Sequence, residues 1–360
     1  MGLSLQNVSV VSAGQPVIDN VSLDLQSGSM NVLLGPTLAG KSSLMRLMAG
    51  LDRPTSGAIL VDGKDALGIP VRKRSVAMVY QQFVNYPSLT VFENIASPLR
   101  VAGLAKAEIE KRVTGAARLL KLEPLLQRLP SQISGGQQQR TAIARAIVKG
   151  ADVVLLDEPL ANLDYKLREE LREELPRIFK ESGAILVYAT TEPLEALLLG
   201  GNTATLSQGR LVEFGPTPQV YHQSSRIESA RVFSDPPLNE TKITKSGGKV
   251  MFGDFHTAPA TGALSGIADG AYTMAFRADI VTLAQPWPKA ITFEGRVSVA
   301  EISGSESFVH VSTALGTLVC VETGVSRLQP GDTVALHVDA TRVFVFGPDG
   351  RRTVSPPAPN

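Results

Sequence analysis

Eight residues near the N-terminus, Gly35 to Ser42 in the order GPTLAGKS, fit the pattern G-x-x-x-x-G-K-[ST] of a phosphate-binding loop. A strand-like apolar run precedes them, and a helical pattern of leucines and methionines follows. Such a loop points backbone N–H groups and the positive end of a helix dipole at nucleotide phosphates. Lys41 would then reach the β and γ phosphates, and the Ser42 hydroxyl would bind Mg²⁺. A glycine loop that only turns the chain is less favoured, because strand, helix, lysine and serine are all in place.

The predicted nucleotide contacts are Gly35, Pro36, Thr37, Leu38, Ala39, Gly40, Lys41, Ser42 and Ser43. Leu38 is unusual among them, because a glycine at this point would let the backbone approach phosphate more closely. The sequence therefore predicts that the affinity of this loop for its nucleotide is tuned or weakened.

A pair of carboxylates follows a second apolar run, Val153 to Leu156. Asp157 at the tip of a buried strand, beside a phosphate loop, can support Mg²⁺ directly or through water. Because side chains alternate along a strand, Glu158 points the other way and can polarise an attacking water as a general base. The alternative is a pair of solvated acids that ends the strand. The phosphate loop upstream favours the catalytic interpretation.

Strand and helix patterns alternate through the first part of the chain, which predicts a largely parallel α/β sheet with ligands at the strands' carboxyl ends. The predicted strands there are 3–10, 17–25, 32–34, 58–61, 75–80 and 153–157, and a surface helix is predicted at 106–122. Beyond Asp235 the pattern changes to short alternating strands with Gly and Pro turns, which predicts an all-β barrel of the OB type. Its strands are predicted at 271–276, 292–299, 307–312, 316–321 and 333–338.

Composition excludes several classes of protein. The 35 basic and 34 acidic residues nearly cancel, so the chain lacks the basic footprint of a nucleic-acid binder, and we expect no nucleic-acid partner even for an OB-type barrel. No apolar run approaches the length of a membrane span, although 43% of residues are hydrophobic. Cys320, the single cysteine, excludes an internal disulfide and fits an inert position in the core.

Five motifs in order carry a family resemblance. They are the phosphate loop at 35–42, Gln81 in MVYQQF, ISGGQQQR at 133–140, LLDEP at 155–159 and the Leu163-Asp164 turn. Together they resemble the ATPase subunits of ABC transporters, and YQQFVNYPSLTVFENIASPL is most similar to the carbohydrate-uptake importers. The resemblance implies a RecA-like ABC ATPase domain at 1–235, with antiparallel β and helical subdomains. It also implies an OB-type regulatory domain at 236–360.

The resemblance assigns ATP and Mg²⁺ as cofactors and gives roles to further residues. Gln81 contacts Mg²⁺ or the attacking water, so the implied metal contacts are Ser42, Gln81 and Asp157. Residues 82–92 border a groove that receives a coupling helix from a membrane subunit. The implied contacts to the ATP of a second ATPase subunit are Ser134, Gly135, Gly136 and Gln137. A helix N-terminus preceded by Ser-Gly-Gly suits that role, because it presents N–H donors to a γ-phosphate.

Three departures from the family pattern surround the nucleotide. Ser12 stands where relatives have an aromatic residue that stacks on adenine, and Leu38 replaces a glycine. Thr191 takes the place of the switch histidine, and all four histidines lie beyond residue 221. That histidine normally holds the γ-phosphate and the attacking water in line. A threonine donates one hydrogen bond but is shorter and does not titrate near neutral pH, so we expect slow hydrolysis with Glu158, Gln81 and Thr191 as the catalytic set.

A weakened site beside an intact 133–140 segment predicts a pair of two different ATPase subunits. The alternatives are that Thr191 suffices and the chain pairs with itself, or that the chain is a soluble ABC ATPase outside transport. The combination GPTLAGKS, YATTEP and ALLLGGNTATL resembles the glycerol importers with two unlike ATPase subunits. The implied partners are a second ATPase subunit, two transmembrane permease subunits and, indirectly, a solute-binding protein. The implied location is peripheral, on the cytoplasmic face of a bacterial inner membrane.

Overall fold

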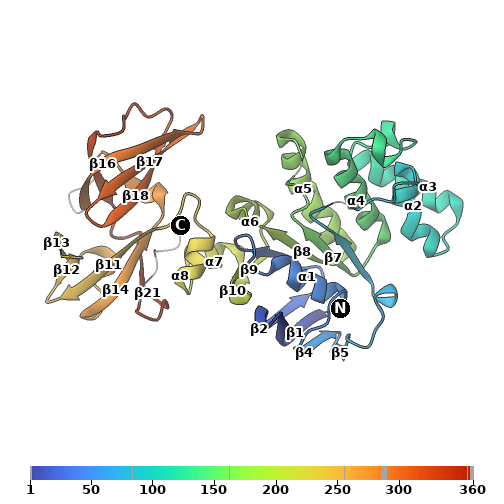
Figure 1. The fold of residues 1–360 in the computed structure, drawn as a ribbon, viewed down its shortest axis with the longest axis horizontal. Coiled ribbons are helices and arrows are strands. Elements are labelled where there is room, and N and C mark those ends of the chain that lie inside the picture. Colours follow the sequence, from blue (N-terminus) through green and yellow to red (C-terminus); the bar gives the residue numbers. More distant parts are fainter. Residues whose placement is uncertain are drawn as a thin grey trace. The chain divides into compact units, whose positions relative to one another are not determined.

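The chain divides into two compact units, Met1–Thr217 and Pro218–Asn360, each described here by itself (Figure 1). The structure is a computed structural model that describes residues 2–354 and Pro356, except Phe83, Asn162, Phe255 and residues 285–289. Trp287, expected in a turn or packed, and most of the proline-rich end from Ser355, expected to fray, lie outside the described residues.

The division between the units falls before two short helices, α7 (Thr217–His222) and α8 (Ile227–Val232), and not at residue 235 as the sequence suggested. The reason is packing. Ile227 and Ala230 of α8 are buried in one cluster with Ala275, Phe344 and Phe346, which all belong to the second unit. The segment expected to close the first unit is therefore part of the core of the second.

A six-stranded, mostly parallel sheet forms the centre of the first unit. Its strands, in spatial order, are β10 (Arg210–Pro216), β9 (Asn202–Ser207), β3 (Met30–Leu34), β8 (Ile185–Thr190), β7 (Val153–Asp157) and β6 (Val76–Val79). Every residue of β7 and β8 is buried, as expected for parallel strands covered on both faces. The parallel pairings β6–β7, β7–β8 and β8–β3 bring the carboxyl ends of four strands to one edge.

A second, antiparallel sheet packs beside the first and confirms the strands predicted at 3–10, 17–25 and 58–61. Its strands, in spatial order, are β2 (Gln15–Gln26), β1 (Gly2–Ser12), β4 (Ser56–Val61) and β5 (Lys64–Asp65). Alternate residues of β1 and β2, including Leu3, Leu5, Leu23 and Leu25, share one core with helix α1 (Lys41–Ala49). This core fixes the helix that follows the phosphate loop.

Three helices form a helical part beyond β6 (Figure 1). They are α2 (Val91–Val101), α3 (Lys106–Leu119, shorter than predicted) and α4 (Gly135–Lys149). Reciprocal capping boxes begin α2, between Thr90 and Glu93, and α4, between Ser134 and Gln137. Helices α5 (Tyr165–Ser182) and α6 (Pro193–Leu199) follow β7 and β8, and Asp164 caps α5 by accepting from the Leu167 N–H at 3.0 Å.

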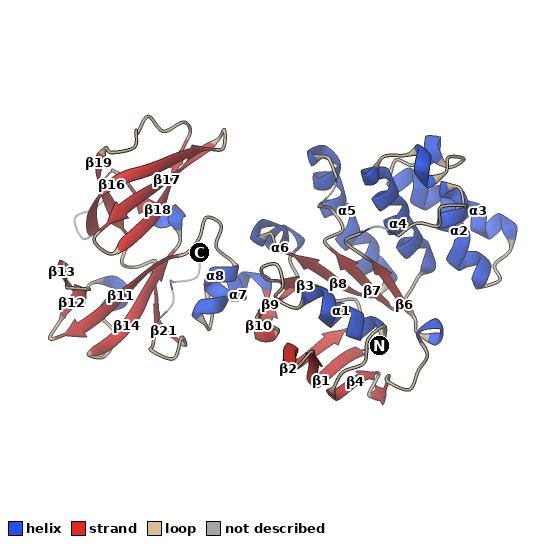
Figure 2. Cartoon of the chain, viewed as in Figure 1, coloured by secondary structure: helices blue, strands red, loops and turns tan. Residues whose placement is uncertain are grey.

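The second unit consists mainly of strands (Figure 2), and it confirms the expected all-β C-terminal domain of OB type. One sheet contains β13 (His256–Pro259), β12 (Lys249–Phe252), β11 (Asn239–Ser246), β14 (Gly270–Phe276), β20 (Phe344–Phe346) and β21 (Arg352–Val354). The other contains β15 (Val281–Thr282), β19 (Thr333–Val338), β16 (Ile291–Ile302), β17 (Glu306–Thr313) and β18 (Gly316–Thr323). Residues from both sheets form one core, in which Cys320 is fully buried and burial raises the thiol pKa to about 12.

No helix among the described residues is long and apolar enough to cross a membrane.

Candidate functional site: a phosphate loop facing a catalytic carboxylate

The phosphate loop joins β3 to α1, and close packing explains both of its glycines. A Cβ at Gly35 would lie 2.5 Å from the backbone oxygen of Leu206. Gly40 has a φ of +100°, and a Cβ there would lie 2.9 Å from Ile18 Cδ1. Leu38 also has a positive φ, 68°, and its side chain is 95% exposed. The side chain therefore projects away from the core, at the conformational cost that a glycine would avoid.

Lys41 turns back into the loop that precedes it. Its ammonium donates to the carbonyl oxygens of Gly35 at 2.8 Å and Pro36 at 3.1 Å, and it lies 3.9 Å from a carboxylate oxygen of Glu158. The side chain is 5% exposed, and burial lowers the pKa of Lys41, while the carboxylates of Glu158 and Asp157 oppose this shift. A desolvated ammonium gains most from a strong anionic partner such as phosphate.

The start of helix α1 has no side-chain cap among the described residues. By contrast, Ser134 caps α4 and Asp164 caps α5. The first-turn N–H groups of α1 are thus available to an anion at the positive end of the helix dipole. A nucleotide phosphate chain fits these donors together with Lys41.

Asp157 and Ser42 meet beside the loop, where the sequence predicted a metal site. Asp157 ends β7 and is buried, and burial raises its pKa, although a hydrogen bond from Ser42 and the charge of Lys41 oppose the rise. A hydroxyl and a carboxylate oxygen in contact are hard ligands of the kind that Mg²⁺ takes together with phosphate oxygens and water. These two residues therefore fit Mg²⁺.

Glu158 and Gln81 also come together. The Gln81 side-chain amide donates to a carboxylate oxygen of Glu158 at 2.8 Å, although the two residues belong to the ends of different strands. Burial raises the pKa of Glu158, the charge of Lys41 lowers it, and nearby acidic residues, Asp157 first, raise it. A carboxylate with a raised pKa accepts a proton more readily, which suits a general base.

Thr191, at the position of the expected switch, is exposed just after β8. The residues before and after it are fixed by a buried network that sequence reasoning missed. Glu195 accepts hydrogen bonds from Thr190 Oγ1 at 2.6 Å and Tyr188 Oη at 3.1 Å, and it pairs with Arg172 at 3.3 Å. Burial raises the pKa of Tyr188 well above its ordinary value, so its hydroxyl remains a donor.

The Arg172–Glu195 pair is almost fully buried, with side chains 7% and 6% exposed. Removing Arg172 from such a pair typically costs about 3–5 kcal/mol, because Glu195 is left buried without its cation. Arg172 itself also pairs with Glu169 at 2.5 Å and with Glu192 at 3.4 Å. The pair thereby holds α5, α6 and the end of β8 in a fixed arrangement. Its sequence signal was weak, since the two residues are separated by a strand and neither belongs to a local motif.

Ser134, Gly135, Gly136 and Gln137 lie at the start of α4, as predicted. Within the part of the chain that the structure describes, no hydrogen bond or ion pair joins them to residues 35–42. Ser12, at the predicted adenine position, lies at the end of β1 beside the turn to β2 and is exposed. The structure thus brings Lys41, Ser42, Gln81, Asp157 and Glu158 together.

Comparison with known proteins agrees with this arrangement. Residues 18–161 match the ABC transporter family model, and residues 274–346 match the TOBE domain model. Two solved structures share 29% sequence identity with this chain and have a TM-score of 0.56, covering 60% of this chain and 98% of theirs. They are the dimeric ATP-binding cassette MJ0796 and its post-hydrolysis state bound to ADP and Pi.

Three curated relatives match along nearly their whole length. An alpha-glucoside transport ATP-binding protein of Rhizobium meliloti is 32% identical over 97% of this chain and 98% of its own. An sn-glycerol-3-phosphate import ATP-binding protein of Rhizobium johnstonii is 33% identical over 99% and 97%, respectively. A xylose/arabinose import ATP-binding protein of Haloferax volcanii is 36% identical over 91% and 88%. The chain belongs to the ABC transporter ATP-binding proteins, an ATPase family that uses ATP with Mg²⁺.

Proposed function

We propose that this chain is the ATP-binding subunit of a solute importer, and that its own nucleotide site hydrolyses ATP slowly. The contact that carries the proposal is the cluster of Lys41, Gln81 and Glu158 at the mouth of the phosphate loop. In the proposed mechanism, residues 35–43 bind the nucleotide phosphates. Ser42, Asp157 and Gln81 would hold Mg²⁺, which neutralises phosphate charge when bound. Glu158 takes the proton from the attacking water.

The weakness of the site is assigned to Thr191. Thr191 directly follows Thr190, whose hydroxyl bonds Glu195 and the Glu192 N–H. The backbone at Thr191 is therefore held in place, but the threonine side chain is short. One missing positioned group of this type typically costs about 10²–10⁴ in rate. Two further residues also weaken the site. Leu38 lets the loop backbone approach phosphate less closely than a glycine would, and Ser12 offers no aromatic ring for adenine to stack on.

A slow site beside a complete 134–137 segment favours a pair with a second, different ATPase subunit. In that pair, Ser134, Gly135, Gly136 and Gln137 close over the nucleotide of the partner, whose own site turns over rapidly. Dimers of a related cassette, bound to ADP and Pi in one case, support a dimeric arrangement in general. The competing proposal is a pair of identical chains in which Thr191 is adequate.

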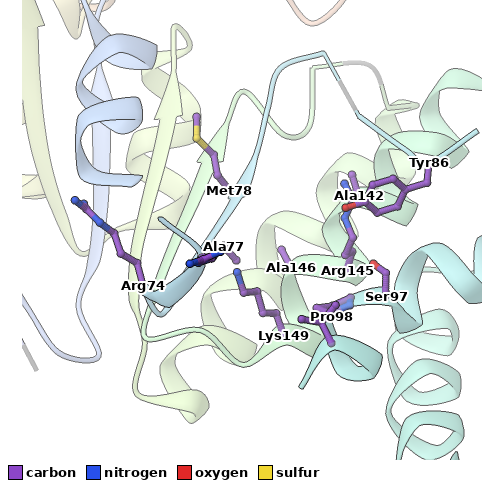
Figure 3. Close-up of a pocket in the computed structure, with 12 residues that line it drawn as sticks. Arg74, Ala77, Met78, Tyr86, Ser97, Pro98, Ala142, Arg145, Ala146 and Lys149 are labelled. Carbon is purple, nitrogen blue, oxygen red and sulfur yellow. The ribbon is translucent and has the colours of Figure 1, made fainter. Parts of the chain in front are cut away.

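A cavity of about 390 Å³ in the first unit is the proposed docking site for a permease subunit (Figure 3). It lies between β6, α2 and α4. Of the described residues that line it, none is acidic, and the basic ones are Arg72, Arg74, Arg145 and Lys149.

Two of these cations, Arg145 and Lys149, contact neutral groups. Arg145 contacts the Tyr86 ring and the Val84 carbonyl oxygen, and Lys149 donates to the carbonyl oxygen of Val76 at 2.5 Å. Burial lowers the pKa of Arg145 and of Lys149. A cavity with poorly solvated positive charge and an aromatic wall suits a helix that brings both carboxylates and apolar side chains.

We expect Arg145→Glu to lower the amount of this chain retained on a tagged permease by about tenfold, because the reversal removes the cation–π contact and repels carboxylates. Arg118→Glu on the exposed face of α3 is the matched control and should leave retention unchanged. If folded Arg145→Glu is retained on the permease in the same amount as wild type, this docking site is ruled out.

The proposed solute is glycerol, and the proposed location is the cytoplasmic face of a bacterial inner membrane, peripherally bound to two permeases that receive solute from a binding protein. The relatives' names cover alpha-glucoside, glycerol 3-phosphate and xylose or arabinose, so the proposal depends on the resemblance of the three segments quoted above. Uptake of labelled glycerol, glycerol 3-phosphate and xylose by cells with and without this chain tests it. Dependence of xylose uptake alone on this chain would refute the glycerol assignment.

A further inference from the structure

Gln139 connects two parts of the first unit that the proposed mechanism treats separately. It belongs to α4, the helix that begins at Ser134, and its side chain is completely buried. Its amide nitrogen donates to the carbonyl oxygen of Glu158 at 3.4 Å and, at closer range, to that of Pro159. The helix that carries the 134–137 segment is thus bonded to the backbone of the catalytic carboxylate.

The backbone at Glu158 needs such support. Its φ is +45°, in the left-handed region, which costs a residue with a side chain roughly 1–2 kcal/mol. Conformations of this kind persist only where the surroundings impose them. On one side, the Glu158 N–H donates to the Ala189 carbonyl oxygen of β8 at 3.0 Å. On the other side, the Glu158 carbonyl oxygen accepts from the Ala161 N–H and from the Gln139 amide, each at 3.4 Å. Gln139 is the side chain among the described residues that bonds the carbonyl oxygens of both Glu158 and Pro159.

The side chain of Glu158 depends on this backbone conformation. Its two carboxylate oxygens lie 2.8 Å from the Gln81 amide nitrogen and 3.9 Å from the Lys41 ammonium nitrogen. A small rotation of the Glu158–Pro159 peptide would move both contacts. A movement of α4 would therefore shift Glu158, the catalytic base, through the hydrogen bonds of Gln139.

Gln139 also lowers the folding stability at this position. Its amide oxygen is buried and has no hydrogen-bond partner among the described residues. Burying an unsatisfied polar atom typically costs about 1–3 kcal/mol, and a leucine of similar size would avoid that cost. The amide donor is the part of the side chain that the structure uses.

We propose that Gln139 is a positioning residue that holds Glu158 in its reactive conformation and makes that conformation depend on the position of α4. The inference rests on the proposed function, in which the start of α4 closes over a partner's nucleotide. When the start of α4 closes over the partner's nucleotide, its movement sets the geometry of Glu158, the general base of this chain's own site. By thermodynamic linkage, the conformation of Glu158 in turn affects how readily α4 closes.

The test compares Gln139→Leu with Thr141→Val, a matched control on the same helix. Thr141 is buried, and its hydroxyl donates to the Gln137 carbonyl oxygen within α4 at 2.8 Å. With the full chain in excess over labelled ATP, we expect Gln139→Leu to lower the single-turnover rate constant about tenfold or more, since small misplacements of reacting groups have large effects. The Kd for ATP should stay within about twofold, and Thr141→Val should change neither value.

A double-mutant cycle separates positioning from general damage. If Gln139 acts through Glu158, adding Gln139→Leu to Glu158→Gln should lower the rate no further. An equal tenfold loss in both backgrounds would overturn the inference.

A second measurement does not need turnover. Hydrogen exchange of the backbone amides of Asp157, Glu158, Leu160 and Ala161 should be faster in Gln139→Leu than in wild type, and unchanged exchange would also overturn the inference. A wild-type chain that binds ATP but shows no hydrolysis above background would instead count against the proposed function, and the exchange result would then decide the role of Gln139 alone.

Discussion

Thr191→His is expected to raise the single-turnover rate of ATP hydrolysis by the full chain about 10²-fold, the lower end of what one positioned catalytic group contributes. The backbone at this point is already fixed, because Thr190 bonds both Glu195 and the Glu192 N–H. Thr191 itself is exposed beside that anchor, so a longer side chain has room to extend. An imidazole there could reach a γ-phosphate and an attacking water that the threonine hydroxyl is too short to hold in line.

Thr191→Val keeps the shape of the threonine and removes its hydroxyl. We expect it to lower the rate about tenfold, because the single hydrogen bond that threonine offers is lost. The affinity for ATP, measured by titration with a fluorescent analogue, should remain similar in both variants. If Thr191→His hydrolyses ATP no faster than wild type while binding it equally well, the threonine is an adequate switch and the site is not weakened there.

Lys41→Ala is expected to raise the Kd for ATP about 10²-fold, since removing one partner of a buried, hydrogen-bonded charge pair costs about 2–5 kcal/mol. Lys41 lies inside the loop with its ammonium between the Gly35 and Pro36 carbonyl oxygens and the Glu158 carboxylate. Without it, the charge of the Glu158 carboxylate would no longer be offset by an ammonium at the mouth of the loop.

Lys41→Arg is the informative companion. It keeps the charge, but its planar guanidinium is too large for a buried site shaped around a compact ammonium, so ATP binding should weaken here as well. Thermal unfolding of both variants checks that the chain remains folded. A Kd for ATP within about threefold of wild type in folded Lys41→Ala would show that this loop does not hold phosphate through its lysine.

The parts of the site that follow from local pattern were predictable from sequence. Residues 32–42 and 153–158 each combine a strand-like run with residues suited to phosphate or metal chemistry at its end. Parallel pairing brings those ends together. The oddity at Leu38 was also visible, and the structure adds that the residue adopts a positive φ with its side chain exposed.

The contacts that the sequence did not reveal are those between segments without a shared motif. Gln139 meets the backbone that follows β7 although it belongs to α4, and Arg172 meets Glu195 because α5 packs against α6. The boundary between the units was misplaced for the same reason. The change of pattern beyond Asp235 suggested a boundary there, whereas α8 packs against a strand near the other end of the chain, at Phe344 and Phe346.

The central claim, that this chain supplies the slow site of an unequal pair, is tested most directly by ATP turnover of the purified transporter. Glu158→Gln in this chain is compared with the matching change in the second ATPase subunit. We predict that Glu158→Gln leaves turnover largely intact, while the change in the partner abolishes it. If this chain instead hydrolyses ATP by itself as fast as the assembly, and Glu158→Gln stops that hydrolysis, the claim is contradicted.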